Sequence, residues 1–253
     1  MFKKMFSRAW WLTTLLVFAG TAVCIRLGIW QLDRLEQRRA FNAQVITMRA
    51  AEGLELNKEL PENISAMEWR AVTVTGKYDF ENQVALRNQY NGDQYGYHLI
   101  TPLQFTSSAG PGQAGLVVLV NRGWIPADGN SAPEDWRKYD EEGMVTVEGQ
   151  IRLGQVKPAF GGVADALPEV GEMLLVWNNL NLEQMSVRWA YPILNIYIQP
   201  DAVGSDTIPP IPFQPVVEIT EGPHFGYALQ WFTFAAILFL GYPFYLRKQC
   251  EPT

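Results

Sequence analysis

Two apolar segments, one near each end of the chain, constrain what this protein can fold into. They cover residues 10–31 and 223–246, and each is long enough to cross a lipid bilayer. At a rise of about 1.5 Å per residue, helices of this length match the roughly 30 Å hydrocarbon core of a membrane. Tryptophan and tyrosine residues near the ends of both segments are typical of the membrane–water interface. We therefore expect two transmembrane helices that contact the lipid bilayer.

Each segment also has an alternative interpretation. Lys3, Lys4 and Arg8 precede the first segment, as in a cleaved signal peptide. Its apolar run is longer than a usual signal core, however, and this favours an uncleaved anchor. The second segment could be a buried core helix, but the interfacial aromatic residues and the basic residues that follow it favour a second anchor.

Basic residues predict the topology of the second anchor. No lysine or arginine occurs between Trp189 and Leu246, whereas Arg247 and Lys248 follow at once. Cytoplasmic flanks carry an excess of basic residues, so we expect a cytoplasmic C-terminal tail, residues 247–253. Two spans place both termini on one side. The N-terminal tail (1–9) is then also cytoplasmic, and residues 32–222 lie outside the cytoplasm.

The charge and cysteine content of the middle region exclude several function classes. Between residues 40 and 222 there are 11 Lys and Arg against 23 Asp and Glu, a net charge of −12. An acidic surface disfavours nucleic acid as a partner. The two cysteines, Cys24 and Cys250, lie outside this region and toward opposite membrane faces, so we expect no disulfide. A C-x-x-C-H haem attachment and a Cys/His zinc cluster are likewise missing from this sequence.

The middle region begins as a helix and continues as strands. Residues 33–56 show helical periodicity without Gly or Pro until Gly53, and short runs of alternating or continuous apolar residues follow Pro61. The run 116–120 is apolar throughout, which predicts a strand buried on both faces. The proline-rich stretch 208–215 predicts an extended linker to the second anchor. The expected fold is an α+β membrane protein in which a two-helix hairpin flanks a mainly antiparallel β barrel or sandwich.

Enzymatic groups are scarce. The sequence contains no G-x-S-x-G, H-E-x-x-H or phosphate-binding loop. His98 is the one histidine of the middle region, and its place in a predicted strand favours a hydrogen-bonded structural residue. We therefore expect a protein that is not an enzyme.

Two groups of residues are candidate sites. Arg122 and Trp124 end a buried strand and could face a partner at its rim, although a strand-to-turn transition, in which Gly123 allows a special backbone angle and Trp124 packs, is the favoured interpretation. At the mouth of the second anchor, His224 is followed at helical spacing by Tyr227 and Trp231. An imidazole with flat rings one and two turns away can ligate a haem iron, but such residues also form ordinary interfacial belts.

The outer end of the first anchor carries a matching pair. Trp30 and Arg34 lie one helical turn apart, so a ring and a guanidinium share one face and could hold a haem propionate or an oxidase subunit. Interfacial anchoring explains this pair as well. Gln31 and Gln230 are polar residues in apolar surroundings, and we treat them as candidate contacts to a partner.

Taken together and in this order, these strings resemble the surfeit locus protein one family, the assembly factors for haem-copper terminal oxidases. The pattern G-x-W-Q-x-x-R occupies residues 28–34. Further matching blocks are VTGKY at 74–78, GYHLITPL at 96–103, VNRGWIP at 120–126 and HFGYALQWF at 224–232. One departure is Arg38, where the family often has lysine, and the positive charge is kept. Because no Arg-rich, acid-poor presequence precedes the first anchor, we expect a bacterial member in the inner membrane, with a periplasmic middle region.

The resemblance implies a function and a site. It implies a chaperone that binds haem a and helps insert it into, or stabilise it in, oxidase subunit I, with haem a synthase as a possible second partner. His224 corresponds to the implicated axial ligand of the haem iron. Trp30, Arg34, Tyr227 and Trp231 would shape the pocket around it. The alternative is a haem-free membrane scaffold that binds the nascent subunit I.

Overall fold

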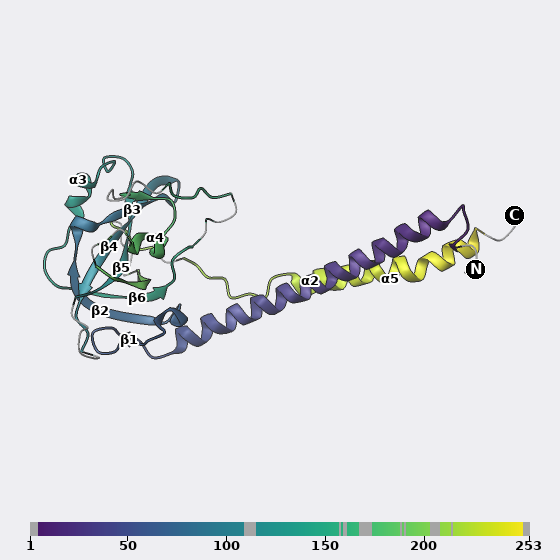
Figure 1. Ribbon diagram of the computed structural model, residues 1–253, viewed down its shortest axis with the longest axis horizontal. Coiled ribbons are helices and arrows are strands. Elements are labelled where there is room, and N and C mark those ends of the chain that lie inside the picture. Colours follow the sequence, from purple (N-terminus) through teal and green to yellow (C-terminus); the bar gives the residue numbers. More distant parts are fainter. Residues whose placement is uncertain are drawn as a thin grey trace. The chain divides into compact units, whose positions relative to one another are not determined.

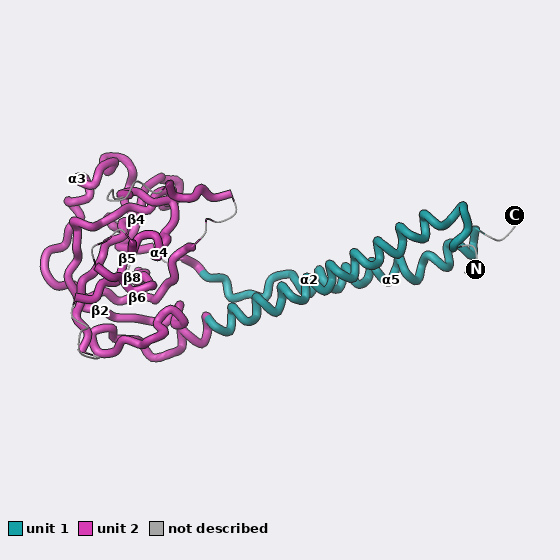
Figure 2. Tube along the Cα trace, in the orientation of Figure 1, with its two compact units in different colours: residues 1–44, 217–253 teal, residues 45–216 magenta. Residues whose placement is uncertain are grey.

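The computed structural model forms two compact units (Figure 2). The helical unit comprises residues 1–44 and 217–253, and the β unit comprises residues 45–216. These boundaries lie farther along the first helix, and slightly earlier before the second, than the predicted limits of 32 and 222. The structure describes residues 5–108, 115–156, 158, 161–166, 174–187, 189, 191–202, 208–213 and 215–249. Parts of both predicted tails, including Cys250, therefore lie outside the described residues.

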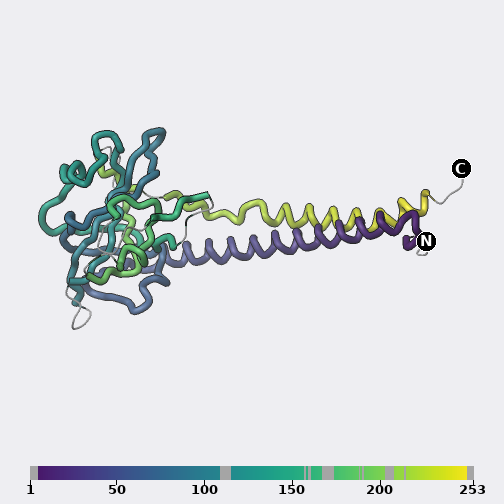
Figure 3. Tube along the Cα trace, turned by 45° about the horizontal axis from the view of Figure 1, so that its top comes forward, coloured from purple at the N-terminus to yellow at the C-terminus, as the bar shows by residue number. Residues whose placement is uncertain are grey.

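The helical unit is an antiparallel pair of α2 (Trp11–Ala50) and α5 (His224–Lys248), seen side by side in Figures 1 and 3. Near the termini, the Trp10 ring packs edge-on against Tyr245, with centroids 6.0 Å apart. Near the opposite end of α5, Gln31 of α2 meets His224. Both helices are long and apolar enough to cross a membrane, as the hydropathy of the sequence predicts.

The two helices meet along a seam with a seven-residue repeat. On α2 the buried positions Thr14, Thr21, Gly28, Leu35 and Asn42 are each seven residues apart. On α5 the corresponding series is Ala228, Ala235 and Tyr242. A seven-residue repeat keeps one stripe of each helix facing the other, as in a coiled coil. Most of these side chains are small, which lets the two backbones approach closely.

The close approach is greatest at Gly28. A Cβ atom at this position would lie 2.7 Å from the Phe232 ring, so only glycine fits without a shift. Nearer the termini, the hydroxyl groups of Thr14 and Tyr242 are 2.5 Å apart and join the helices by a buried hydrogen bond. Close packing and a buried polar contact thus join the two helices.

The β unit is a barrel-like mixed sheet built around five strands (Figure 1). Neighbours follow the order β2–β6–β8–β5–β4, and β4 pairs back onto β2, while β1 and the β3–β7 pair attach outside this ring. The strands are β1 (Leu54–Glu55), β2 (Ala71–Tyr78), β3 (Val84–Asn91), β4 (Gln94–Phe105), β5 (Leu116–Pro126), β6 (Val145–Arg152), β7 (Val176–Trp177) and β8 (Ile193–Pro200). The short helices are η1 (Ile64–Met67), η2 (Phe80–Asn82), α3 (Pro133–Trp136), η3 (Arg137–Tyr139) and α4 (Leu182–Ser186).

The strand pairing refines the expected fold. A barrel was expected as one of two alternatives, and the structure has a barrel-like sheet. It is less uniformly antiparallel than expected, because β1–β2, β3–β7 and β5–β8 are parallel pairs. The long chain segment between β5 and β8 allows β8 to return beside β5 in the same direction.

Strand β5 is buried on both faces, as its continuous apolar run predicts. Val118 and Val120 join the main barrel core, whereas Leu119, between them, packs in a second cluster with Trp177 and Met185. Because alternate strand residues point to opposite faces, one strand serves two cores.

Two predicted boundaries need correction. The helix expected over 33–56 ends at Ala50, and Leu54 and Glu55 instead pair in parallel with β2. Leu54 and Leu56 are completely buried in the barrel core, and this burial outweighs continued helix beyond Gly53. The predicted linker 208–215 is also more than a spacer, because Ile211 forms a β-bridge with Trp124 of β5.

Candidate functional site

The first candidate site lies in the helical unit, at the start of α5. His224 is the first residue of α5 and is half-buried. Its Nδ1 lies 2.8 Å from Oε1 of Gln31 on α2, a hydrogen bond that links positions 193 residues apart in the sequence. The other ring nitrogen, Nε2, makes no hydrogen bond to the described residues. The imidazole therefore has one anchored nitrogen and one available nitrogen.

A glycine borders the available edge of this ring. Gly222 has φ +67°, a conformation that favours glycine, and a Cβ there would contact Cδ2 at 3.4 Å and Nε2 at 3.6 Å. Any other residue would place an atom against this edge of the imidazole. Glycine at position 222 thus leaves the edge of His224 that carries Nε2 open.

The chain entering α5 is held by side chains of α2. Arg39 binds both carboxylate oxygens of Glu221, at 2.8 and 2.9 Å. Arg38 donates to the backbone carbonyls of Glu218 and Thr220, and Asn42 donates to the Thr220 carbonyl. These contacts, which we call the linker clamp, fix where α5 begins. The sequence analysis did not predict this clamp; the basic pair at 38–39 and the acidic residues 218 and 221 before α5 are the signals that could have indicated it.

The other residues expected around His224 are distributed over two neighbourhoods. Trp30 and Arg34 do form a pair, with the guanidinium carbon 5.7 Å from the ring centroid. Tyr227 is about half exposed, and Trp231 is half-buried with its ring edge-on to Phe234. The structure brings His224 together with Gln31, and Trp30 together with Arg34.

The seven-residue repeat indicates on which flank of the helix pair four of the candidate residues lie. An apolar groove of about 500 Å³ lies along one flank of the helix pair. On each helix it is lined by a seam residue and by residues that come one or four positions after a seam residue. Its lining is Phe18, Thr21, Ala22, Ile25, Phe232, Ala235, Ala236 and Phe239. Residues one and five positions before a seam residue lie on the opposite flank. Arg34 and Tyr227 precede seam residues by one position, and Trp30 and Gln230 by five. All four therefore belong to the flank without the groove.

The second candidate site was the end of β5, and the structure gives it an internal role. Arg122 and Trp124, expected at a rim facing a partner, are both buried. The Arg122 side chain is 2% exposed, and its terminal nitrogens donate to Gln83 Oε1 at 3.2 Å and Glu141 Oε1 at 2.8 Å. A buried guanidinium needs such partners, and they all come from this chain.

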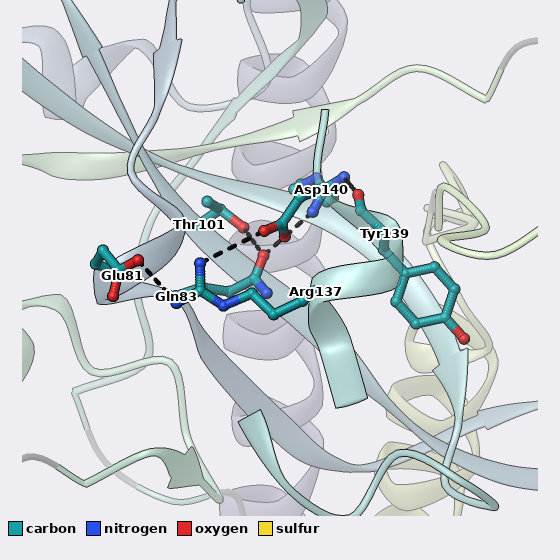
Figure 4. A network of polar contacts seen from close by, with 7 residues as sticks. Glu81, Gln83, Thr101, Arg137, Tyr139 and Asp140 are labelled. Atoms are coloured by element: carbon teal, nitrogen blue, oxygen red, sulfur yellow. Dashed lines mark hydrogen bonds and ion pairs between the residues drawn. The ribbon is translucent and has the colours of Figure 1, made fainter. Parts of the chain in front are cut away.

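The network around Arg122 ties a surface segment to the barrel. Its guanidinium also donates to the Tyr139 carbonyl and stacks on the rings of Tyr78 and Phe80. Burial raises the pKa of Tyr78, which keeps the phenol neutral beside the cation. Figure 4 shows the neighbouring contacts, in which Thr101 donates to Gln83 and Arg137 contacts both Glu81 and Asp140. In the described part of the chain, Arg122 is thus engaged by residues of the β unit.

Gly123 allows the chain before α5 to dock on β5. Its φ is +123°, and a Cβ would lie 2.3 Å from the Ile211 carbonyl oxygen. This close approach permits two backbone hydrogen bonds between Trp124 and Ile211, of 2.7 and 2.8 Å. The distinctive string at 121–124 is therefore explained by the segment 208–213, which we call the strap.

His98 is a structural residue, as expected. It is buried on β4, its Nδ1 accepts from Asn121 at 3.2 Å, and Asn121 donates also to Gln199. Burial lowers the pKa of His98 to about 4, so the ring is neutral at physiological pH. Within the described part of the chain, no group of three or more His, Cys, Asp or Glu residues could hold a metal ion.

This chain is similar in sequence to the members of a known protein family. A family model described as the SURF1 family matches residues 18–236, which include most of α2, about half of α5 and the whole β unit. A SURF1-like protein of Rickettsia conorii is 27% identical, with 93% of this chain and 92% of the relative covered. A SURF1-like protein of Caenorhabditis briggsae is 26% identical, covering 97% of this chain and 79% of the relative. Surfeit locus protein 1 of Takifugu rubripes is 26% identical, with 90% of this chain and 94% of the relative covered.

Proposed function

This chain belongs to the SURF1 family, and on that premise we propose that it is an assembly factor for a haem-copper terminal oxidase of the cytochrome c oxidase type. It binds haem a at His224 and aids the insertion of haem a into subunit I, or its stabilisation there. It acts by binding and catalyses no reaction. The similarity to a Rickettsia protein supports a bacterial member.

The observation that carries the proposal is the half-buried imidazole of His224 at the start of α5. One of its nitrogens is held by Gln31, and the other has no hydrogen-bond partner among the described residues. Nε2 is not among the buried polar atoms of the described residues that lack a partner, so a ligand or solvent can reach it. Since Gly222 leaves that edge of the ring open, a planar ligand can approach it.

Side chains of the two helices offer groups that suit an iron porphyrin with carboxylates. When bound, haem a supplies an iron that takes a histidine nitrogen as an axial ligand. Arg34 offers an exposed guanidinium, a suitable partner for a propionate carboxylate. Trp30, Tyr227 and Trp231 offer aromatic faces against which a macrocycle packs.

The proposed setting is the inner membrane. Both helices cross it, both termini are cytoplasmic, and the β unit is periplasmic. The length and hydropathy of α2 and α5 support this arrangement, as does the position of Arg247 and Lys248 directly after the second apolar segment. His224 then lies at the periplasmic mouth of the hairpin, where it can receive haem a from haem a synthase and present it to subunit I.

Co-expression with haem a synthase tests the proposal. The full chain is purified in detergent, and haem a per chain is read from the optical spectrum. We expect a Soret band in the unaltered protein, its loss in His224→Ala, and its retention in Phe225→Leu, a control at the exposed neighbouring position. An unaltered protein that co-purifies subunit I without a Soret band would instead support the haem-free scaffold.

A further inference from the structure

We infer that Gln31 is a positioning residue that fixes the tautomer of His224 and leaves Nε2 as the nitrogen able to ligate iron. This inference rests on the proposed haem function for its purpose, but the tautomer itself is a property of the haem-free chain. Gln31 was a candidate contact to a partner protein. In the structure its side chain forms a hydrogen bond with the imidazole on the facing helix.

The hydrogen bond determines which nitrogen carries the proton. Oε1 of Gln31 is a carbonyl oxygen and can only accept, so Nδ1 at 2.8 Å must donate. A neutral imidazole carries one N–H, and Nε2 is then left with its lone pair. Metal-ligating histidines commonly donate their second nitrogen to an oxygen acceptor in this way, which fixes the ring orientation and raises its basicity.

Both partners of this bond are held in place by other contacts. Gln31 lies on the seam side of α2, three residues after Gly28 and four before Leu35, which are both buried. His224 is fixed at the start of α5 by the linker clamp, in which Arg39 binds Glu221 with two hydrogen bonds. Because the seam and the linker clamp set the backbone positions of both residues, they favour this hydrogen bond. The partial burial of both groups strengthens it further.

The inference predicts a specific ranking of substitutions at position 31. Glutamate keeps an oxygen acceptor at the same distance and should preserve the tautomer. Methionine has similar length and volume but no oxygen acceptor, so the fixed tautomer is lost while the seam remains packed. Gln230→Met is the matched control, because it makes the same chemical change at an exposed position of α5.

The first experiment needs no haem. Nitrogen-15 NMR of the histidine-labelled, haem-free full chain in detergent reads the protonation of both ring nitrogens of His224. We expect a protonated Nδ1 and a bare Nε2 in the unaltered chain, in Gln31→Glu and in Gln230→Met, and a tautomer mixture in Gln31→Met. A bare Nδ1 in the unaltered chain, or an unchanged tautomer in Gln31→Met, would overturn the inference.

The second experiment adds haem a to the same proteins. Loss of an oxygen partner for a ligating histidine lowers metal affinity by roughly 10- to 100-fold, and we expect a loss of this size in Gln31→Met, with affinity restored in Gln31→Glu. The glutamate carboxylate should also lower the reduction potential of the bound haem, which a purely structural role would not do. Equal affinity and potential in the unaltered chain, Gln31→Glu and Gln31→Met would contradict a positioning role. Failure of the unaltered chain to bind haem a would refute the proposed function instead, and the NMR result would still decide the tautomer.

Discussion

Gly123→Ala should detach the strap from β5. The alanine Cβ would lie 2.3 Å from the Ile211 carbonyl oxygen, and the backbone at φ +123° disfavours any side chain. The strap must therefore move, and the two hydrogen bonds between Trp124 and Ile211 break.

The expected loss of stability combines two contributions. Forcing alanine into a positive-φ conformation costs roughly 1–2 kcal/mol. Two lost backbone hydrogen bonds, at about 0.5–1.5 kcal/mol each, add about 1–3 kcal/mol. Gly123→Ala should then destabilise the protein by about 2–5 kcal/mol.

Gly129→Ala separates these contributions. Gly129 also has positive φ, +67°, but a Cβ there would meet no atom within 4 Å. This control should cost only the conformational part. The difference between the two variants therefore measures the docking of the strap at about 1–3 kcal/mol.

Urea unfolding of the full chain in detergent, followed by tryptophan fluorescence, gives both free energies. Limited proteolysis then reports whether cleavage within 208–213 becomes faster in Gly123→Ala alone. The reasoning would be refuted if the two variants were equally destabilised and the strap equally resistant to cleavage.

Three further predictions concern the barrel and the seam. In the unfolded chain, His98 binds a proton below its ordinary pKa of about 6.5, whereas in the folded chain burial lowers its pKa to about 4. The free energy of unfolding should therefore fall by about 3 kcal/mol as the pH drops from 6.5 to 4. His98→Gln should flatten this slope in thermal melts from pH 4 to 7. Gly28→Leu should separate the helices, because a Cβ there would lie 2.7 Å from the Phe232 ring. It should lower Tm more than Gly20→Leu, where a Cβ would lie 3.5 Å from Leu238. Equal melting temperatures would contradict the seam. Arg122→Met should cost roughly 1–3 kcal/mol because it leaves the Tyr139 carbonyl without its donor, while Gln83 keeps its hydrogen bond from Thr101; exposed Glu141→Gln should cost about 1 kcal/mol or less. Urea unfolding that ranks these two changes in the opposite order would show the network to be misassigned.

Features set by hydropathy were predictable from the sequence. The two long helices follow from their apolar length, and the double burial of β5 follows from its continuous apolar run. Both properties depend on residues that are adjacent in the sequence, so the sequence alone is enough to detect them.

The helix seam was not predictable in the same way. Its repeat on α2 runs through Thr14, Thr21, Gly28 and Asn42, which are small or polar rather than apolar. Within a membrane-spanning segment, the apolar residues face lipid, and the small or polar ones mark the contact between helices. A search for the seven-residue spacing of small residues would have revealed the seam.

Contacts between distant residues limited the prediction of the sites. The sequence placed Gln31 and His224 at the same end of the two anchors, but only the structure shows them in contact. Arg122 was a candidate for a rim that faces a partner because it lies near the end of a buried strand. Its burial depends on Gln83 and Glu141, which the barrel brings in from other segments.

Ligand rescue tests the central claim most directly. In His224→Gly the imidazole is removed and a space of similar size remains, so free imidazole can replace the side chain as a ligand. We predict that this variant, co-expressed with haem a synthase, is purified without haem a, and that haem a and imidazole added together restore the spectrum of the unaltered protein. Full haem a occupancy of His224→Gly without imidazole would contradict the assignment of His224 as the ligand.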